Sequence, residues 1–187
     1  MHEPVSALPG ARYSGLVEIA EAGPRGMIVL RGDLASEAVA RAVREATGQE
    51  LPEPRAIVLG AETGVTWMAP DELLILADYK AVPAMLTALT QALEGAFATV
   101  ADVSDARAVF TLKGVQACDV LAKACPVDFA DFPVGTIRRT RAAQVAAAIW
   151  RTGEDDFTLV CFRSVAQYMW DLLRTLAQPG GEVGLYR

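Results

Sequence analysis

Apolar residues in the first half of the chain recur with the period of a helix in two places. From about Ser36 to Ala46 the pattern predicts one helix, and Gly48 is placed to end it. Residues 82–94 predict a second helix, in which Pro83 suits the first turn. Short apolar runs bounded by glycine or turn residues predict strands over residues 26–31, 56–59, 65–68 and 73–76.

The second half of the chain repeats this order. The predicted elements are a strand over 107–113, a helix over 114–125, strands over 144–150 and 157–162, and a last helix that opens at Ser164. Ser164 and Gln167 have the spacing of a capping box at the start of that helix. The two passes are offset by about 82 residues, so Gly32 aligns with Gly114 and Trp67 with Trp150. An alternative stays open, in which turn residues common to α+β chains produce the same likeness.

The repeat predicts an α+β fold made of duplicated βαββα units. We expect a single domain over residues 1–187, with pseudo-repeats at about 25–95 and 106–178. Three prolines and three glycines in residues 1–24 predict an irregular N-terminal segment. Each half would bury too little apolar surface alone, so the halves are expected to share a sheet, or to pack face to face, around a shared core.

Composition restricts the chemistry available to the chain. Its 187 residues include 17 basic and 23 acidic side chains, for a net charge of -6, which argues against nucleic acid as a partner. The single histidine, His2, leaves few routes to a catalytic triad or a zinc site. No apolar run reaches the roughly 18 residues that span a membrane. An odd count of three cysteines favours a reducing compartment, and we expect a cytoplasmic protein.

Motifs for phosphate, dinucleotide or serine-nucleophile chemistry are absent from the sequence. Two acidic clusters, at Asp71-Glu72 and at 154–156, fall in predicted hairpin turns and are interpreted as solvated acids. The sequence therefore predicts no catalytic, cofactor-binding or metal-binding residue.

Arg138, Arg139 and Arg141 form the densest basic cluster and precede a predicted strand. Three arginines so close together can hold a phosphate or the carboxylates of a partner, so they are a candidate partner interface. Simple solvation of a loop is the alternative. The three tryptophans are expected to be core or interface anchors.

Several spaced segments, spread over roughly residues 5–177, resemble the gamma subunit family of heterotetrameric sarcosine oxidase. The main ones are Trp67–Leu76, Val103–Arg107, Asp119–Asp128, Phe132–Gly135 and Ser164–Leu173. The resemblance implies kinship with the folate-binding domain of the glycine-cleavage T protein, which is itself a duplicated α+β unit. In the folate-using relatives one strand supplies an aspartate beside the folate. The corresponding strand here, Val145–Trp150, has no carboxylate, so folate binding is not carried over.

The resemblance implies a non-catalytic assembly subunit of a complex that oxidatively demethylates sarcosine to glycine. Its expected partners are the alpha, beta and delta subunits, and FAD, FMN, NAD and tetrahydrofolate are implied on those other subunits. Two alternatives stay open: a free-standing folate-binding or one-carbon-transfer protein, and an interaction subunit of another flavin-dependent amine oxidase or dehydrogenase. A missing partner predicts exposed apolar surface on the isolated chain.

Overall fold

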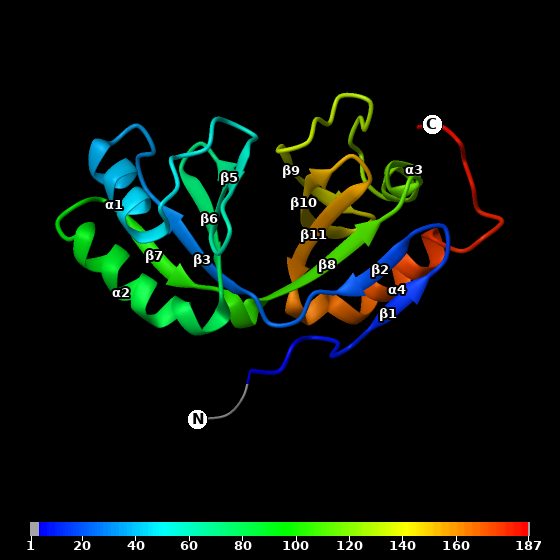
Figure 1. Cartoon of the computed structure of the whole chain (residues 1–187), viewed down its shortest axis with the longest axis horizontal. Coiled ribbons are helices and arrows are strands. Elements are labelled where there is room, and N and C mark those ends of the chain that lie inside the picture. The colour runs from blue at the N-terminus through cyan, green and yellow to red at the C-terminus, as the bar shows by residue number, and fades with distance from the viewer. Residues whose placement is uncertain (1–3, 187) are drawn as a thin grey trace. The chain divides into compact units, whose positions relative to one another are not determined.

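A computed structural model of the chain describes residues 4–186 in two compact units (Figure 1). Unit 2 consists of Arg25–Ser104. Unit 1 combines the residues up to Pro24 with those from Asp105 onward. His2 lies outside the described residues.

Unit 2 is a five-stranded antiparallel sheet, in the order β4-β5-β6-β3-β7, with helices on one face. Its elements are β3 (Gly26–Arg31), α1 (Glu37–Thr47), β4 (Ile57–Leu59), β5 (Gly64–Ala69), β6 (Glu72–Ala77), the 3-10 turn η1 (Tyr79–Ala81), α2 (Val82–Ala92) and β7 (Thr99–Asp102). The predicted helices α1 and α2 are confirmed.

Helix α1 owes its sharp limits to its capping residues. The Ser36 hydroxyl accepts a hydrogen bond from the backbone N–H of Ala38, and Gly48 ends the helix at a φ of 69°, a conformation that glycine adopts without strain. Between these caps, Val39, Ala42 and Val43 face the sheet and are buried against its apolar side chains.

Unit 1 is a six-stranded antiparallel sheet in the order β1-β2-β8-β11-β10-β9. Its elements are β1 (Arg12–Ser14), β2 (Glu18–Glu21), β8 (Arg107–Lys113), α3 (Ala117–Ala122), β9 (Ile137–Ala142), β10 (Val145–Gly153), β11 (Asp156–Phe162), the 3-10 turn η3 (Arg163–Val165) and α4 (Ala166–Leu176). A further 3-10 turn, η2 (Ser104–Ala106), precedes β8.

Equivalent cross-strand pairs relate the two sheets. Arg31 on β3 lies opposite Glu72 on β6, and Lys113 on β8 lies opposite Asp156 on β11. Each of these pairs also forms a salt bridge. Both hairpins, β5–β6 and β10–β11, carry a bulge just before the turn. The α+β class and the duplicated pattern predicted from the sequence agree with this arrangement.

The strand that precedes each repeat pairs in the sheet of the other repeat. β7 directly precedes the second repeat but pairs with β3, whereas β2 precedes the first repeat but pairs with β8. The hydrogen bonds continue alike in both places, from Ala22 N–H to the Val109 carbonyl and from Val103 N–H to the Met27 carbonyl. Each sheet is therefore completed by a strand from the other side of the repeat boundary.

The sequence analysis predicted an irregular N-terminal segment. The segment is instead partly regular, because β1 and β2 form within it. The glycines of this segment had been interpreted as loop residues. Gly15 instead lies in the short connection between the two strands. Val17 and Ile19 are buried in the core of unit 1, which ties the segment to β8.

Of the two arrangements expected for the halves, the single shared sheet is wrong. The described strands form two sheets, and the hydrophobic clusters are separate, one built from residues of each unit. Each sheet carries its own pair of helices, so each unit has an apolar interior of its own.

Three local expectations also fail. Thr66, not Trp67, is equivalent to Trp150, because Trp67 pairs with Leu73 just as Arg151 pairs with Phe157. The predicted capping box is absent, since Ser164 lies inside η3 and Val165 caps α4 without a side-chain hydrogen bond. The helix predicted over 114–125 is shorter, because α3 covers only Ala117–Ala122.

Candidate functional site

Arg138, Arg139 and Arg141 lie on β9, the edge strand of the unit 1 sheet, and not in a loop. Side chains alternate along a strand, so Arg139 and Arg141 share one face and Arg138 lies on the other. Arg139 and Arg141 are exposed. Charged side chains on an edge strand oppose unwanted pairing with strands of other molecules. The position of these arginines can therefore be explained by protection of the sheet edge as well as by partner binding.

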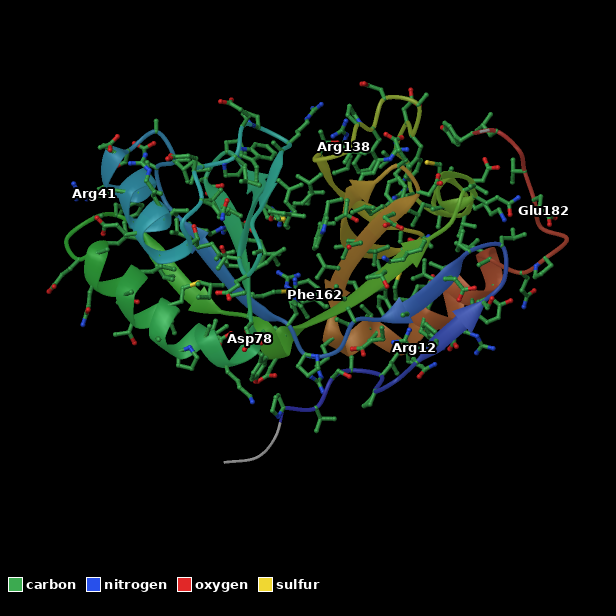
Figure 2. All side chains as sticks on the ribbon, viewed as in Figure 1. Arg12, Arg41, Asp78, Arg138, Phe162 and Glu182 are labelled. Carbon is green, nitrogen blue, oxygen red and sulfur yellow. The ribbon has the colours of Figure 1, made fainter. Side chains whose placement is uncertain are left out.

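Arg138, labelled in Figure 2, is held by its own unit. Its guanidinium donates to the carbonyl oxygens of Ile137 at 3.0 Å and of Asp131 at 2.9 Å. Its central carbon also lies 4.8 Å from the centroid of the Phe132 ring, a cation–π distance. Arg138 therefore has a structural role within unit 1.

The acidic cluster at Asp71-Glu72 is not simply solvated, as the sequence analysis had interpreted it. Glu72 is buried, and its Oε2 accepts hydrogen bonds from Arg31 Nε at 3.0 Å and Arg31 Nη2 at 2.7 Å. In the second cluster, Asp155 is exposed and Asp156 lies 3.6 Å from Lys113 Nζ.

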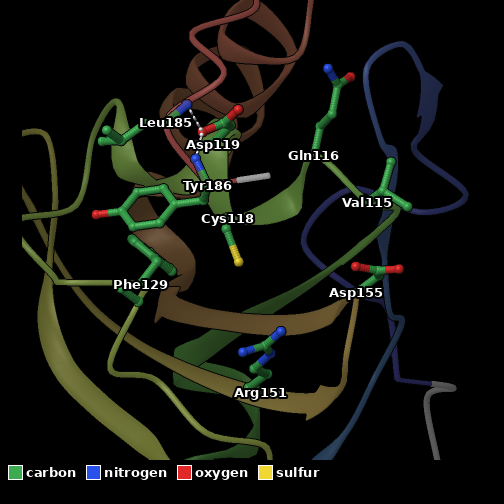
Figure 3. A pocket seen from close by; sticks show the side chains of 10 residues that line it. Val115, Gln116, Cys118, Asp119, Phe129, Arg151, Asp155, Leu185 and Tyr186 are labelled. Atoms are coloured by element: carbon green, nitrogen blue, oxygen red, sulfur yellow. Dashed lines mark hydrogen bonds between the residues drawn. The ribbon is translucent and has the colours of Figure 1, made fainter.

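A pocket of about 720 Å³ opens beside α3 in unit 1 (Figure 3). Its walls come from the start of α3, the turn between β10 and β11, the loop before β9 and the C-terminal segment. The lining side chains that matter most are those of Cys118, Phe129, Arg151, Asp155 and Tyr186. Its walls therefore combine apolar side chains with charged ones.

Arg151 contributes structure rather than an open cationic site. Its guanidinium donates to the carbonyl oxygens of Phe132, Gly153 and Glu154. The same group lies 5.4 Å from the centroid of the Phe157 ring. These contacts use the donors with which arginine would otherwise grip an anion.

The cysteines of unit 1 are protonated near neutral pH. Burial raises the pKa of the Cys118 thiol, Arg151 opposes this shift, and Asp155 and Asp119 add to it. Burial raises the pKa of Cys125 to about 12 and that of Cys161 to about 11. A thiol is a poor nucleophile when its thiolate is so scarce, so none of the three is set up for nucleophilic catalysis.

Strand β10 contains the stretch that the resemblance aligns with a folate-side carboxylate, and it has only apolar residues from Val145 to Trp150. Within residues 4–186 there is no group of three or more histidine, cysteine or acidic side chains that could hold a metal ion. None of the described helices is both long and apolar enough to cross a bilayer.

Phe97, in the connection between α2 and β7, is fully exposed. Its register equivalent in unit 1 is Leu16, which packs partly buried against the core. Sequence reasoning missed Phe97 because a lone phenylalanine in a short Gly-Ala-rich loop carries no pattern. An exposed aromatic side chain of this size is typical of a binding anchor.

The strand order defines the class of protein. In unit 2, β3, α1, β5, β6, α2 and β7 follow the βαββαβ order of the ferredoxin-like fold, and unit 1 has the same arrangement with β2 in the place of β7. The chain is thus a duplicated ferredoxin-like protein. It belongs to the sarcosine oxidase gamma subunit family, whose model matches residues 31–178. The resemblance inferred from the sequence motifs is confirmed.

Solved structures support the same assignment. A chain of the heterotetrameric sarcosine oxidase from Corynebacterium sp. U-96, in complex with pyrrole 2-carboxylate, is 28% identical, with a TM-score of 0.82. The match covers 93% of this chain and 91% of that one. A search of the curated proteins gave no match.

Two more distant structures share the fold alone. The aminomethyltransferase T of the glycine cleavage system from Bartonella henselae is 19% identical with a TM-score of 0.64, over 83% of this chain and 44% of that one. The chain therefore spans less than half of that transferase. The regulatory subunit of aspartate kinase from Thermus thermophilus is 14% identical with a TM-score of 0.51, over 89% of this chain and 99% of that one.

Proposed function

We propose that this chain is a non-catalytic assembly subunit of a sarcosine oxidase complex, which oxidatively demethylates sarcosine to glycine. The observation that carries the proposal is the match to nearly the whole of one chain of a heterotetrameric sarcosine oxidase. The partners are the alpha, beta and delta subunits, which carry FAD, FMN, NAD and tetrahydrofolate. The complex is assigned to the cytoplasm, in keeping with three unpaired cysteines.

The side chains of the candidate site favour assembly over chemistry. β10 has no carboxylate in the stretch aligned with the folate-binding relatives. The guanidinium of Arg151 is engaged by carbonyl oxygens, and burial keeps the Cys118 thiol protonated. Neither the guanidinium of Arg151 nor the protonated thiol of Cys118 is suited to act as a general base.

Two surface features suit a docking role. Phe97 on unit 2 offers a large apolar side chain to a partner pocket, where aromatic residues commonly carry much of the binding energy. Arg139 and Arg141 on unit 1 offer two guanidinium groups on one face of an edge strand, which suits carboxylates on a partner. We assign the candidate interface to these two arginines, with Arg138 supporting the strand from the other face.

The test is affinity purification of the tagged chain from its native organism under mild conditions, followed by mass spectrometry of the bound proteins and a sarcosine-dependent flavin reduction assay. We expect the large flavoprotein subunits to co-purify with the activity. If the chain elutes alone and binds tetrahydrofolate at micromolar concentration, it is the free-standing folate protein instead. Partners that oxidise a different amine would identify the other alternative.

Matched variants locate the docking surface within the same experiment. We expect Phe97→Ser to reduce recovery of the partners about tenfold or more, as loss of an aromatic anchor does. A variant with Arg139→Ala and Arg141→Ala is expected to weaken recovery in a salt-dependent way. Its control carries Arg41→Ala and Lys80→Ala, two exposed cations of unit 2 whose loss changes the net charge equally. Equal effects of the two double variants would rule out a specific role for β9.

A further inference from the structure

The C-terminal segment returns to unit 1 and is held there by one carboxylate. Asp119, in the first turn of α3, accepts hydrogen bonds from three consecutive backbone amides. Its Oδ2 accepts from Gly184 N–H at 2.9 Å. Its Oδ1 accepts from both Leu185 N–H and Tyr186 N–H, each at 2.9 Å (Figure 3). The carboxylate is thus saturated by main-chain donors of a single short segment.

Asp119 is only 3% exposed, so its carboxylate oxygens depend on these partners for their hydrogen bonds. A buried carboxylate is costly unless hydrogen bonds satisfy its oxygens, and charge-assisted bonds from N–H groups are about twice as strong as neutral ones. The segment supplies those donors from its backbone, whatever its side chains are. The arrangement therefore recognises an extended run of peptide.

An aromatic contact adds selectivity at the end of the segment. The Tyr186 ring meets the Phe129 ring edge-on, with centroids 5.8 Å apart and planes at 68°. Phe129 belongs to the buried core of unit 1 and is rigidly placed by Phe132 and Phe157. Tyr186 and Leu185 in turn form part of the wall of the 720 Å³ pocket that Cys118 lines.

The residues just before this contact lie at the surface. Val183 is 61% exposed, and the stretch from Gly181 to Val183 has no regular secondary structure. The hydrogen bonds to Asp119 and the ring contact with Phe129 all fall on residues 184–186. A segment fastened at one short stretch can leave as a unit without unfolding the sheet.

We propose that the pocket beside α3 is a peptide-binding site whose ligand in the isolated chain is its own C-terminal segment, residues 184–186. Asp119 binds three consecutive backbone amides, and Phe129 receives the aromatic side chain that follows. Release of the segment opens the pocket toward Cys118. The inference goes beyond the proposed assembly role and rests only on residues of unit 1.

The test uses Asp119→Asn in the full chain, with Asp155→Asn as the matched control. The substitution at Asp119 replaces one acceptor oxygen by an amide that cannot accept from Gly184 N–H, whereas Asp155 lines the same pocket and is exposed. Hydrogen exchange of the amides of residues 184–186 gives the direct readout. Loss of hydrogen bonds to a charged group predicts exchange about tenfold faster or more in Asp119→Asn, and little change in the control.

Cys118 supplies a second readout, through its rate of modification by an aromatic disulfide. Opening the pocket is expected to raise that rate about tenfold, in step with the exchange of the tail amides. Cys125 and Cys161 are buried, so their modification reports unfolding and serves as the internal reference. Gly184→Pro is the second variant, because it removes one donor and cannot adopt the φ of 70° found at Gly184, while leaving Asp119 unchanged.

A peptide with the sequence of residues 181–187, added in excess to the intact chain, tests whether the site takes its ligand in trans. We expect it to accelerate exchange of the chain's own tail amides by competition, and to do so less in Asp119→Asn. The proposal is overturned if the peptide has no effect, or if tail release always comes with equal deprotection of β8 and β11. In either case Asp119 would be a fixed part of the fold and the site would not bind peptide.

Discussion

Helices α1 and α3 occupy equivalent places in the two units, but they cover their sheets by different means. Helix α1 has 11 residues, a serine cap at its start and a glycine at its end. Helix α3 has 6 residues and no side-chain cap. The face that α1 covers by continuing as a helix must be covered in unit 1 by something else.

Aromatic side chains take over where α3 stops. Phe129 and Phe132, from the loop that leads to β9, pack against each other and against Phe157 on β11, with centroid distances of 5.6 to 5.9 Å. Phe129 also contacts Tyr186. The phenylalanine side chains of this loop thus fill the core where α3 ends. Beside α3 there remains the pocket that the C-terminal segment helps to line.

The largest expected effect comes from removing a ring from this cluster. Phe132→Ala should destabilise the protein by about 3–5 kcal/mol, because it leaves a large cavity in a rigid core. Val43→Ala, on the covered face of α1, should cost about 2 kcal/mol, since fewer buried atoms are lost. Urea denaturation of both variants gives the comparison. Equal losses would mean that the aromatic loop is no more important to unit 1 than one helical residue is to unit 2.

The equivalent ion pairs at the strand ends should differ by a smaller amount. Glu72→Gln removes a buried charge that accepts two hydrogen bonds from Arg31, and should cost about 1–3 kcal/mol. Asp156→Asn breaks a half-exposed pair with Lys113 at 3.6 Å and should cost about 0.2–1 kcal/mol. The same denaturation assay at low and high salt separates them, because only the exposed pair should be salt-sensitive. A larger loss for Asp156→Asn would contradict the assignment of Glu72 as the buried partner.

The helix starts should show the smallest effect. Ser36→Ala removes the capping hydrogen bond of α1 and should cost about 1 kcal/mol. Gln116→Ala changes the corresponding position of α3, which makes no capping hydrogen bond, and should be nearly neutral. Thermal unfolding followed by circular dichroism is sensitive enough for this pair. If both substitutions cost the same, the contrast between the two helix starts has no energetic basis.

The sequence predicted the elements whose signals are local. Helix α1 was predicted almost to the residue, since its apolar stripe lies between Ser36 and Gly48. β8 was predicted with its observed limits, because glycine and charge bound a clear apolar run. The sarcosine oxidase gamma subunit family was predicted too, from several spaced motifs that span nearly the whole chain.

Features that depend on distant pairing were not predicted. β2 and β7 are four residues each, and they become strands only because β8 and β3 provide partners for them. Trp67 and Trp150 looked equivalent because both precede a hairpin, yet their registers differ by one residue. A shift of one residue turns a side chain to the other face of a sheet, so the likeness was false. The sequence around Asp119 also has no pattern that predicts its hydrogen-bond donors, the backbone amides of residues 184–186.

The pairing of β2 with β8 and of β7 with β3 decides which sheet keeps all its strands when the two repeats are separated. Residues 25–104 include every strand of their own sheet. Residues 105–187 do not, because β8 would lose β2 and with it the hydrogen bonds that Glu18–Glu21 make. Cutting the chain between the repeats would keep the sheet of unit 2 whole but would remove β2 from the sheet of unit 1. The two repeats thus have the same architecture, but only the sheet of unit 1 depends on a strand that precedes the first repeat.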